Sequence, residues 1–455
     1  MVSGGAREFS SSTRKEALRD ADGQVFDVAV VGAGINGSAT ANLLATSGIR
    51  TVLLDRRDFA YGTSSRSSKM IHGGLRYLQQ GGRVMEVRRL LRERDYWLSS
   101  SGDVVRMRFD LLLTEHGWNR HMLAFGLFLY SLLDGRFEVP RVKDNTGEYP
   151  EAVRGYFTYW DAVTHDARLV IGHVCSAWQM GATCLNYVDI LSISGSGPYT
   201  VRIRDSLDGQ VAEFTCTCLV NASGPWAGDV ARMAGVGLPV SLTLSRGGMH
   251  LVLTCPGGTL RNAVAFRSAI DGRQLFMVPR GGNTVILGTT EVKVESPDDL
   301  ECSREEEMYL MDSASAVFPW VRQCGVVARY TGIRPLIGSH SDPGRASRDS
   351  SIVVTGNVVH VLGGKLTDHR VTARRAARAV SGGITGKRVS GSGPDIVYRR
   401  PAVADPVDWD RRYECAIFPE DIYVRREGGW FFYDPTVHRE LAGGDAAGGG
   451  GTCYS

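Results

Sequence analysis

The stretch that most constrains the fold is residues 26–55, which read FDVAVVGAGINGSATANLLATSGIRTVLLD. The apolar run at residues 28–31 predicts a buried strand, and the next segment has apolar residues at helical spacing until Gly48, a typical helix stop. Residues 51–54 are β-branched and apolar and predict a second strand. A strand, a helix and a strand in this order predict an α/β fold with a parallel sheet.

Three glycines lie at the junction of the first strand and the helix. Gly32, Gly34 and Gly37 have the GxGxxG spacing, which permits a tight turn, close approach of backbone to a pyrophosphate, and close packing of helix on strand. Asp55 follows the second strand, where a carboxylate can accept a hydrogen bond from a ribose hydroxyl. The pattern predicts dinucleotide binding, and the alternative is a glycine turn that serves packing alone. The pattern does not distinguish FAD from NAD.

The sequence after Asp55 favours FAD. An NAD domain would continue with a helix and a strand, whereas residues 62–78 read GTSSRSSKMIHGGLRYL. Short hydroxyl side chains and bare glycine backbone suit a pyrophosphate or a flat ring, although solvated linkers have a similar composition. Two later strands also end in glycine turns, at Gly224 in VNASGPW and at Gly363 in VLGGKLT. Turns that converge on one parallel sheet suit an extended flavin dinucleotide better than a single pocket.

Composition and charge exclude several classes of protein. The chain has 455 residues, 43% apolar and 22% charged, with a formal charge of +3, which gives no global reason to expect nucleic acid. Nine cysteines without a CxxC pair fit free thiols in a reducing compartment. The N-terminus lacks the apolar core of a signal peptide. The apolar residues 122–135 are too few to span a bilayer and form either a buried helix or an interfacial one.

Several segments resemble, in order, the motifs of the FAD-dependent glycerol-3-phosphate dehydrogenase family. They are VVGAGINGSATA, GTSSRSSKMIHGGLRYL, YWDAVTHDARLV, LVNASGPWA, LGTTEV, TGIRPL and LGGKLT, and they cover residues 26–370. The resemblance implies an FAD-binding Rossmann-like domain with an antiparallel β substrate domain above the flavin ring. The implied fold is similar to glycine oxidase and D-amino acid oxidase. Only part of the family's helical C-terminal domain is matched, so a shortened helical segment is expected there.

The resemblance and the composition together give a domain plan. Residues 1–24 are expected to be a flexible arm with one short helix. The FAD-binding domain is discontinuous and takes residues 25–100, 155–240 and 335–385. The substrate domain, or cap, takes residues 101–154 and 241–334. Residues 386–455 are an abbreviated C-terminal region whose glycine-rich tail is expected to be disordered.

The resemblance assigns the cofactor contacts to backbone turns and short polar side chains. Near the fingerprint, the expected FAD contacts are Gly32, Gly34, Ile35, Asn36, Gly37 and Asp55. In the serine-rich segment they are Thr63, Ser64, Ser65, Ser68, Lys69, His72, Gly73 and Gly74. Later in the chain they are Val188, Gly224, Trp226, Gly364, Lys365, Leu366 and Thr367.

For the substrate, the resemblance implies cations that bind a phosphate. The matching positions are Arg76, Arg334, Arg348 and Lys365, with Tyr77 beside them. Each of these cations has an alternative interpretation as a surface salt-bridge partner, and for an arginine taken alone that alternative is the better one. Lys365 follows two glycines at a predicted helix start, where the helix dipole disfavours a cation unless an anion or an electron-rich ring is adjacent.

The expected catalytic residues are His250, Arg334 and Lys365. His250, in GGMHLVL, is the candidate base for the hydroxyl proton because imidazole titrates near neutral pH. The alternative is that the arginines lower the pKa of the alcohol without a dedicated base.

The activity implied by the resemblance is oxidation of sn-glycerol 3-phosphate to dihydroxyacetone phosphate, with the C2 hydride passing to flavin N5. The family passes the electrons to a quinone or, in its oxidase branch, to oxygen. Further expectations are a cytoplasmic protein, peripheral contact with the inner face of the membrane, and a homodimer. No metal is expected.

Two departures from the family pattern keep other functions open. The family reads threonine and tyrosine after GGKLT, where this chain has Asp368 and His369, and an aspartate near Lys365 would repel a phosphate. The C-terminal region is also shorter. One alternative is therefore an FAD-dependent tailoring oxidase or dehydrogenase for another alcohol or an amine. Another is a flavin- or nucleotide-binding scaffold without catalysis.

Overall fold

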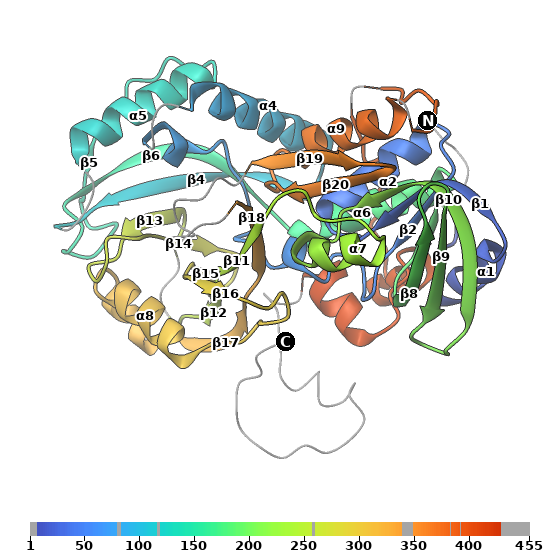
Figure 1. Ribbon diagram of the computed structural model, residues 1–455. Helices are drawn as coiled ribbons and strands as arrows, with labels where there is room; N and C mark the ends of the chain where they lie inside the picture. The colour runs from blue at the N-terminus through green and yellow to red at the C-terminus, as the bar shows by residue number, and fades with distance from the viewer. Residues whose placement is uncertain are drawn as a thin grey trace, which may run out of the picture.

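The computed structural model describes residues 7–79, 83–115, 119–256, 260–338, 349–382, 384–391 and 393–428. These residues form two domains that lie side by side, which we call the parallel-sheet domain and the cap (Figure 1). Strands of the cap lie between strands of the parallel sheet in the sequence, so both domains are assembled from separated parts of the chain.

The parallel-sheet domain is built on a sheet with the order β19-β20-β10-β1-β2-β7. The strands from β20 to β7 are parallel to their neighbours, β19 is antiparallel to β20, and the β8–β9 hairpin continues the sheet from β10. Both strands predicted at the start of the chain are confirmed. The strands are β1 (Val25–Val31), β2 (Thr51–Leu54), β7 (Thr183–Leu185), β8 (Val188–Gly195), β9 (Tyr199–Asp205), β10 (Val211–Asn221), β19 (Ser350–Thr355) and β20 (Val358–Gly363).

Packing on both faces explains why β1 and β2 read as apolar runs. Val28 and Val30 of β1 face the core shared with α2, α6 and α9, whereas Ala29 faces the core shared with α1 and the β8–β9 hairpin. The helices of this domain are α1 (Ser11–Ala21), α2 (Ile35–Thr46), α6 (Asp166–Gln179), α7 (Ala227–Met233) and α9 (His369–Ser381), with short turns η1 (Thr63–Ser65) and η2 (Gly224–Trp226).

The N-terminal segment docks on this domain over its described part. The Arg14 side chain of α1 is buried and forms an ion pair with Asp205 at 2.8 Å. Phe9 stacks on Trp178 with ring centroids 4.3 Å apart. The short helix expected in this segment is present, but from residue 7 onward the segment is docked rather than flexible, because two buried side chains outweigh its polar composition.

The cap contains two sheets, with the orders β17-β12-β15-β14-β13-β4-β6-β3 and β16-β11-β18; β5 pairs with β6. All neighbours are antiparallel except β13 and β4. The strands are β3 (Met70–Ile71), β4 (Val104–Leu113), β5 (Lys143–Asp144), β6 (Gly155–Thr164), β11 (Leu242–Gly247), β12 (His250–Thr254), β13 (Ala263–Arg267), β14 (Gln274–Pro279), β15 (Thr284–Gly288), β16 (Glu291–Val294), β17 (Gly325–Tyr330) and β18 (Ile333–Ile337).

Helices cover both faces of the larger cap sheet (Figure 1). Leu111 and Phe157 face the core shared with α3, α4 and α5, whereas their neighbours Leu112 and Tyr156 face the core shared with α8 and η3. These elements are α3 (Leu75–Gln79), α4 (Val84–Ser100), α5 (Arg120–Leu133), α8 (Arg304–Ser315) and η3 (Pro319–Gln323).

The domain boundaries in the structure differ from the expected ones. Helix α4 packs Val87, Leu90 and Leu91 on the cap sheet, although the sequence assigns residues 25–100 to the FAD-binding domain. Strands β3, β6 and β18 also belong to the cap sheets. The cause is the long antiparallel pairing of β4 with β6, which draws the segments before and after both strands into the cap.

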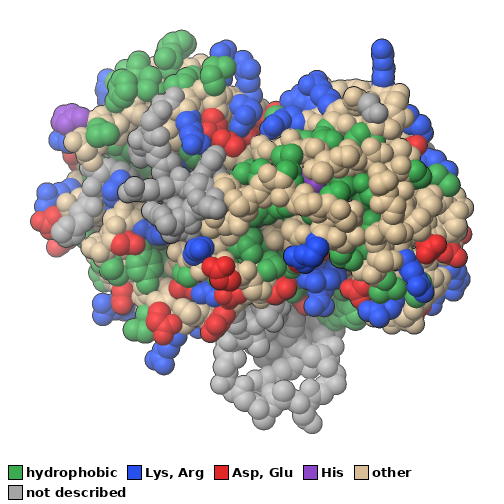
Figure 2. Space-filling view, viewed as in Figure 1, with side chains coloured by type: hydrophobic (Ala, Val, Ile, Leu, Met, Phe, Trp, Pro, Cys, Tyr) green, Lys and Arg blue, Asp and Glu red, His purple; other side chains and the backbone are tan. Residues whose placement is uncertain are grey.

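Helix α5 is only half buried. Leu123 and Leu127 face the cap core, whereas the side chains of Met122 and Phe125 are 64% and 63% exposed. Figure 2 shows hydrophobic side chains gathered over this helix. The interpretation as a fully buried helix therefore does not hold for its outer face. Among the described residues, no helix combines the length and the apolar composition needed to cross a membrane.

One pair of cysteines is joined. Cys255 and Cys324 form a disulfide between β12 and β17, where the register places Thr254 opposite Gly325. The expectation of free thiols is therefore wrong for this pair, since the antiparallel pairing joins residues 69 apart that no sequence motif connects. Cys453 lies outside the described residues. The free cysteines among the described residues are Cys175, Cys184, Cys216, Cys218, Cys302 and Cys415.

The described part of the C-terminal region packs on the parallel-sheet domain. It contains α10 (Pro406–Tyr413) and the single π-helical segment η5 (Asp421–Arg426). Tyr398 and Cys415 are part of the same core as α2 and α6. The tail that we expect to be disordered lies outside the described residues.

We expect the substitution Asp410→Asn to stabilise the protein increasingly as pH rises. Asp410 is fully buried in α10, and burial, followed by the negative charges of Glu414 and Glu427, raises its pKa to about 9. Between the ordinary carboxyl pKa of about 4 and this value, the folded state binds a proton that the unfolded state has released, so stability falls as pH rises.

The measurement is the melting temperature of both proteins from about pH 5 to about pH 8, over which the advantage of the variant should grow by at least about 2 °C. Asp408→Asn is the control, because Asp408 lies on the same helix and its side chain is 59% exposed. A pH-independent difference for Asp410→Asn would contradict the expectation.

Candidate functional site

A cavity of about 1000 Å³ lies between the two domains. On one side its walls are the residues that end β1, β2 and β10, including Val31, Leu54 and Ala222. On the other side they are cap residues such as Phe109, Tyr159 and Phe276. In open α/β sheets, ligands bind beyond the carboxyl ends of the parallel strands, so this cavity is the candidate site.

The glycine fingerprint forms the tight turn that the spacing predicts. Gly32 has a φ of +98° and donates its N–H to the Leu54 carbonyl at 2.8 Å. A Cβ on Gly37 would overlap the carbonyl oxygen of Gly32, so only glycine lets α2 pack this closely on the turn. The start of α2, including Gly34, Ile35 and Asn36, lines the cavity and directs the helix N-terminus toward it.

Asp55 holds this turn from the next strand. Its Oδ2 accepts a hydrogen bond from the Ala33 N–H at 2.7 Å, and its Oδ1 accepts one from the Arg57 N–H at 3.0 Å. Burial raises the pKa of Asp55 to about 6, although these two hydrogen bonds act in the opposite direction. The carboxyl lines the cavity and also fixes the backbone of the fingerprint.

The serine-rich segment is laid against the cavity rather than exposed as a linker. The Ser64 hydroxyl accepts a hydrogen bond from the Ile35 N–H at 2.9 Å and so caps α2. The Thr63 hydroxyl donates to the Ile333 carbonyl of the cap. Thr63, Ser64 and Ser68 all line the cavity.

Ser65 and Lys69 of the serine-rich segment have structural roles and do not line the cavity. Lys69 is buried and forms an ion pair with Asp166, and its ammonium also donates to the Ser65 carbonyl at 2.6 Å. Burial lowers the pKa of Lys69, and the nearby Asp166 acts against this shift. Neither Lys69 nor Ser65 lines the cavity, so the structure does not place them at the site expected for FAD contacts.

The glycine turns converge on the cavity, as the sequence predicts. The Asn36 amide donates to the Gly363 carbonyl at 3.0 Å, which joins the fingerprint to the GGKLT turn. The Thr367 hydroxyl exchanges hydrogen bonds with the backbone N–H and carbonyl of His72 at 3.1 and 3.2 Å. Gly224 lines the same cavity from the third turn.

Most of the residues predicted to form the site meet at this cavity. Those that line it are Gly32, Gly34, Ile35, Asn36, Asp55, Thr63, Ser64, Ser68, His72, Gly74, Arg76, Tyr77, Val188, Gly224, Trp226, Arg334, Gly364, Lys365, Leu366 and Thr367. Those that lie behind its walls are Gly37, Ser65, Lys69, Gly73 and His250. Arg348 lies outside the described residues.

Lys365 is already paired with carboxylates. Its ammonium lies 2.8 Å from Glu86 and 2.7 Å from Asp349, and 5.3 Å from the centre of the Tyr77 ring. Burial acts to lower the pKa of Lys365, but its anionic surroundings outweigh burial and raise it. Asp368 forms an ion pair with Arg89 at 3.1 Å, so the aspartate that departs from the family pattern has its own cation.

Arg334 projects into the cavity from β18. Its Nη1 lies 3.4 Å from Glu291, whose carboxylate also lies 3.6 Å from Arg273. A Cβ on Gly247 would approach Arg334 Nη1 to 2.6 Å, so glycine on β11 makes room for the guanidinium. Arg334 and Arg273 both line the cavity.

His250 lies behind the cavity wall. Its Nδ1–H donates to the Gly248 carbonyl, so its Nε2 accepts a hydrogen bond from the Ser68 hydroxyl at 2.9 Å. The ring stacks on Tyr330 with centroids 4.7 Å apart. Burial first, and then the charge of Arg334, lowers the pKa of His250 to about 3, which leaves a neutral and weakly basic imidazole.

Several cap residues of the site are missed by motif reasoning. Arg267 and Arg273 flank the β13–β14 hairpin and add positive charge to the cavity wall. Tyr159 and Phe276 add aromatic surface. Strand alternation in YFTYWD and RQLFMV is the signal that could have placed them, but it does not tell which face of a strand meets a ligand.

These features define a class of protein, in which a dinucleotide-binding sheet and a β-rich cap enclose one cavity. A family model described as FAD dependent oxidoreductase matches residues 27–378, and the chain belongs to this family. The glycine cradle and a buried Asn36 Oδ1 that has no hydrogen-bond partner among the described residues fit a polar ligand such as FAD. The fold and the cavity therefore agree with membership of this FAD-dependent family.

Two curated relatives have about one-third sequence identity. Glycerol-3-phosphate dehydrogenase of Mycobacterium leprae is 33% identical over 371 residues, covering 78% of this chain and 63% of the relative. D-erythritol 1-phosphate dehydrogenase of Brucella abortus is 32% identical over 373 residues, covering 78% of this chain and 73% of the relative. The chain thus spans less than two-thirds of the length of the M. leprae relative.

Solved structures show the same fold. Glycerol-3-phosphate dehydrogenase from Bacillus halodurans with FAD aligns with a TM-score of 0.72 at 23% identity, covering 94% of this chain and 91% of that one. Glycine oxidase from Geobacillus kaustophilus aligns with a TM-score of 0.58 at 20% identity, covering 83% and 100%. The expected similarity to glycine oxidase is thereby confirmed.

Proposed function

We propose that the protein oxidises a phosphorylated polyol and that its substrate is sn-glycerol 3-phosphate, which yields dihydroxyacetone phosphate. The observation that carries the proposal is that Arg76, Arg334 and Lys365, from separate chain segments, line the same cavity as the glycine fingerprint. Guanidinium groups in particular match the geometry of a phosphate. The relatives named for glycerol 3-phosphate and for D-erythritol 1-phosphate support a polyol phosphate.

The chain's own residues would bind and orient the substrate. When bound, FAD supplies the acceptor for a hydride from the substrate carbon. Arg334 and Arg76 would hold the phosphate, which fixes the position of the reacting carbon. The positive charge along this wall would also lower the pKa of the substrate hydroxyl, because a nearby cation favours the deprotonated form.

The position of His250 favours a mechanism in which the cations lower the pKa of the substrate hydroxyl over one in which a dedicated base removes the proton. Its ring does not line the cavity, and its Nε2 is already bonded to the Ser68 hydroxyl. With a pKa of about 3, the imidazole has little affinity for a proton near neutral pH. We therefore assign His250 the task of positioning Ser68, a residue that lines the cavity.

The second candidate function is oxidation of another alcohol or of an amine. It is favoured by Lys365, whose charge is already compensated by Glu86 and Asp349. Less positive charge then remains for a phosphate, so the arginines alone would have to bind it. A neutral or cationic substrate would be better tolerated at this corner of the cavity.

The test is a substrate panel on the FAD-loaded protein without oxygen. We expect sn-glycerol 3-phosphate to bleach the absorbance of oxidised flavin, and glycerol, which lacks the phosphate, to leave it unchanged. Faster bleaching by D-erythritol 1-phosphate would retain the class of substrate and replace the specific one. Bleaching only by unphosphorylated alcohols or by amines would establish the second candidate instead.

We propose that a quinone takes the electrons, with oxygen as the alternative. The assay follows reoxidation of substrate-reduced flavin by a soluble quinone and, separately, by dissolved oxygen. Reoxidation by oxygen alone would assign the protein to the oxidase type.

We expect α5 to bind anionic membranes. Met122 and Phe125 project from its outer face, where Figure 2 shows a hydrophobic surface, and Arg120 at the start of the helix and Arg141, eight residues after its end, are exposed. Replacing both apolar residues by serine should weaken flotation with phosphatidylglycerol-containing vesicles at least about tenfold, because each buried side chain contributes about 1.5–3 kcal/mol.

Ile270→Ser is the matched control, because Ile270 is similarly exposed, at 62%, but belongs to the β13–β14 connection and not to α5. Failure of the unmodified protein to float would contradict membrane binding. Light scattering on the same samples would show whether this surface instead joins two copies in a homodimer.

A further inference from the structure

We propose that residues 414–426, here called the clasp, hold the loop after β2 in the conformation that binds FAD. The inference rests on membership of the FAD-dependent family and not on the identity of the substrate. None of the clasp residues lines the cavity. Their expected effect is therefore on cofactor affinity through the loop, which makes them positioning residues.

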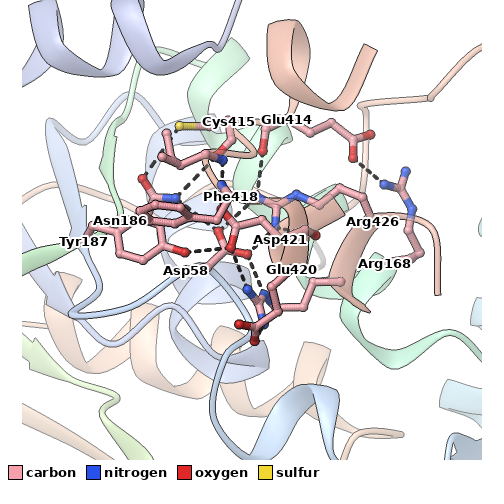
Figure 3. Close-up of polar contacts among 12 residues, drawn as sticks. Asp58, Arg168, Asn186, Tyr187, Glu414, Cys415, Phe418, Glu420, Asp421 and Arg426 are labelled. Atoms are coloured by element: carbon pink, nitrogen blue, oxygen red, sulfur yellow. Dashed lines mark hydrogen bonds and ion pairs between the residues drawn. The ribbon is translucent and has the colours of Figure 1, made fainter. Parts of the chain in front are cut away.

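The first contact of the clasp is with Asp58. This side chain is fully buried and lies three positions after Asp55. Arg425 Nε donates to its Oδ2 at 2.6 Å, and Arg426 donates to both of its carboxylate oxygens (Figure 3). Burial acts to raise the pKa of Asp58, but the two arginines outweigh burial and lower it, so the pair stays ionised.

The second contact is with the chain just before β8. The Tyr187 hydroxyl donates to Asp421 Oδ1 at 2.6 Å, and its ring packs edge-on against Phe418 with centroids 5.2 Å apart (Figure 3). Asn186 donates to Asp58 at 3.1 Å and, more weakly, to the Cys415 carbonyl at 3.4 Å. The clasp thus contacts two segments that are distant in sequence, the loop after β2 and the chain just before β8.

These two segments form the wall around Asp55. The Val188 N–H donates to the Asp55 carbonyl at 2.9 Å, and the Tyr187 N–H donates to the Arg57 carbonyl at 3.1 Å. Asp55, Arg57 and Val188 all line the cavity. Arg425 also lies 5.7 Å from the ring centre of Tyr61, another lining residue.

A fixed loop should bind a ligand more tightly than a mobile one. Ordering a loop costs conformational entropy, and a loop that is already ordered does not incur this cost on binding. The clasp supplies the order through buried charge pairs, which are specific in geometry even where their net contribution to stability is small. Loss of the clasp should therefore weaken FAD binding even in a protein that remains folded.

The test begins with Arg425→Gln in the full-length chain stripped of FAD. We expect the dissociation constant for FAD, measured by quenching of flavin fluorescence, to rise at least about tenfold. Arg425→Lys should restore part of the affinity. Arg400→Gln is the control, because Arg400 pairs with Asp410 and Glu427 within the same C-terminal region and does not contact the loop.

An unchanged dissociation constant in Arg425→Gln, at any melting temperature, would overturn the proposal. If Arg425→Gln does not fold, Tyr187→Phe is the variant that tests the proposal, because it removes only the hydroxyl bonded to Asp421. This variant should also weaken FAD binding. An affinity for FAD equal to that of the unmodified protein would overturn the proposal.

Hydrogen exchange supplies a readout without any substitution. Coupling between two sites is reciprocal, so FAD should slow exchange of the amides of residues 414–426, although these residues are outside the cavity. Exchange there that is unaffected by FAD would also overturn the proposal.

Discussion

Replacing Gly37 with alanine is expected to yield a protein that binds FAD at least about a hundredfold more weakly. A Cβ at this position would overlap the Gly32 carbonyl and lie 3.1 Å from the Ala222 Cβ, so α2 must move away from the turn. Overpacking of this kind costs about 1–3 kcal/mol, and the moved helix would no longer direct its N-terminus at the pyrophosphate. The measurement is FAD titration of the apoprotein together with its melting temperature.

Gly228→Ala is the control for this experiment. Gly228 also lies in a helix, α7, and a Cβ there would meet no atom within 4 Å. Alanine also has the higher helix propensity, so this variant should keep its FAD and its stability. Full FAD binding by Gly37→Ala would show that the fingerprint serves packing alone, the alternative that the sequence leaves open.

Replacing Arg334 with alanine is expected to lower kcat/KM for the phosphorylated substrate about a hundredfold or more. A hydrogen-bonded contact with a charged group contributes up to about 3 kcal/mol, and the substitution would also remove the Arg334–Glu291 ion pair at the cavity wall while leaving the Arg273–Glu291 pair. Arg334→Lys keeps the charge but loses the planar fork, so its effect should be intermediate. Steady-state kinetics with FAD in excess gives the comparison.

Arg329→Ala is the matched control for this experiment. Arg329 also contacts a glutamate, Glu307, at 2.5 and 2.8 Å, but it does not line the cavity. Its loss should leave kcat/KM nearly unchanged. Equal activity of Arg334→Ala and the unmodified protein would remove Arg334 from the site and with it the main support for an anionic substrate.

The core of the dinucleotide-binding half is predictable from sequence because local rules act there together. Residues 28–31 and 51–54 are buried on both faces, and Gly32 and Gly37 between them have no room for a side chain. Docking of α1 is not predictable in this way, since Arg14 finds its partner Asp205 far along the chain. The domain boundary expected near residue 100 also differs from the structure, because the pairing of β4 with β6 joins residues that are far apart in the sequence.

Within the site, too, features set by local sequence are predictable and features set by long-range contacts are not. Backbone positions such as Gly32 and Gly364 are found by motif, since the turn itself requires them. The surroundings of charged side chains are not, because Lys365 and His250 are each defined by partners from other segments. A motif can place a residue at a site, but its charge state and its free hydrogen-bonding capacity depend on neighbours that the motif does not contain.

The interleaving of the two domains has a kinetic consequence. The chain enters the cap at β3, returns at α6, enters the cap again at β11 and returns after β18, so the cavity walls are crossed by several connections. We therefore expect that the cap and the sheet do not separate about one hinge and that release of a bound cofactor requires several segments to loosen together. We expect FAD to have a long dwell time and to remain with the protein through purification, as a prosthetic group rather than an exchanging co-substrate.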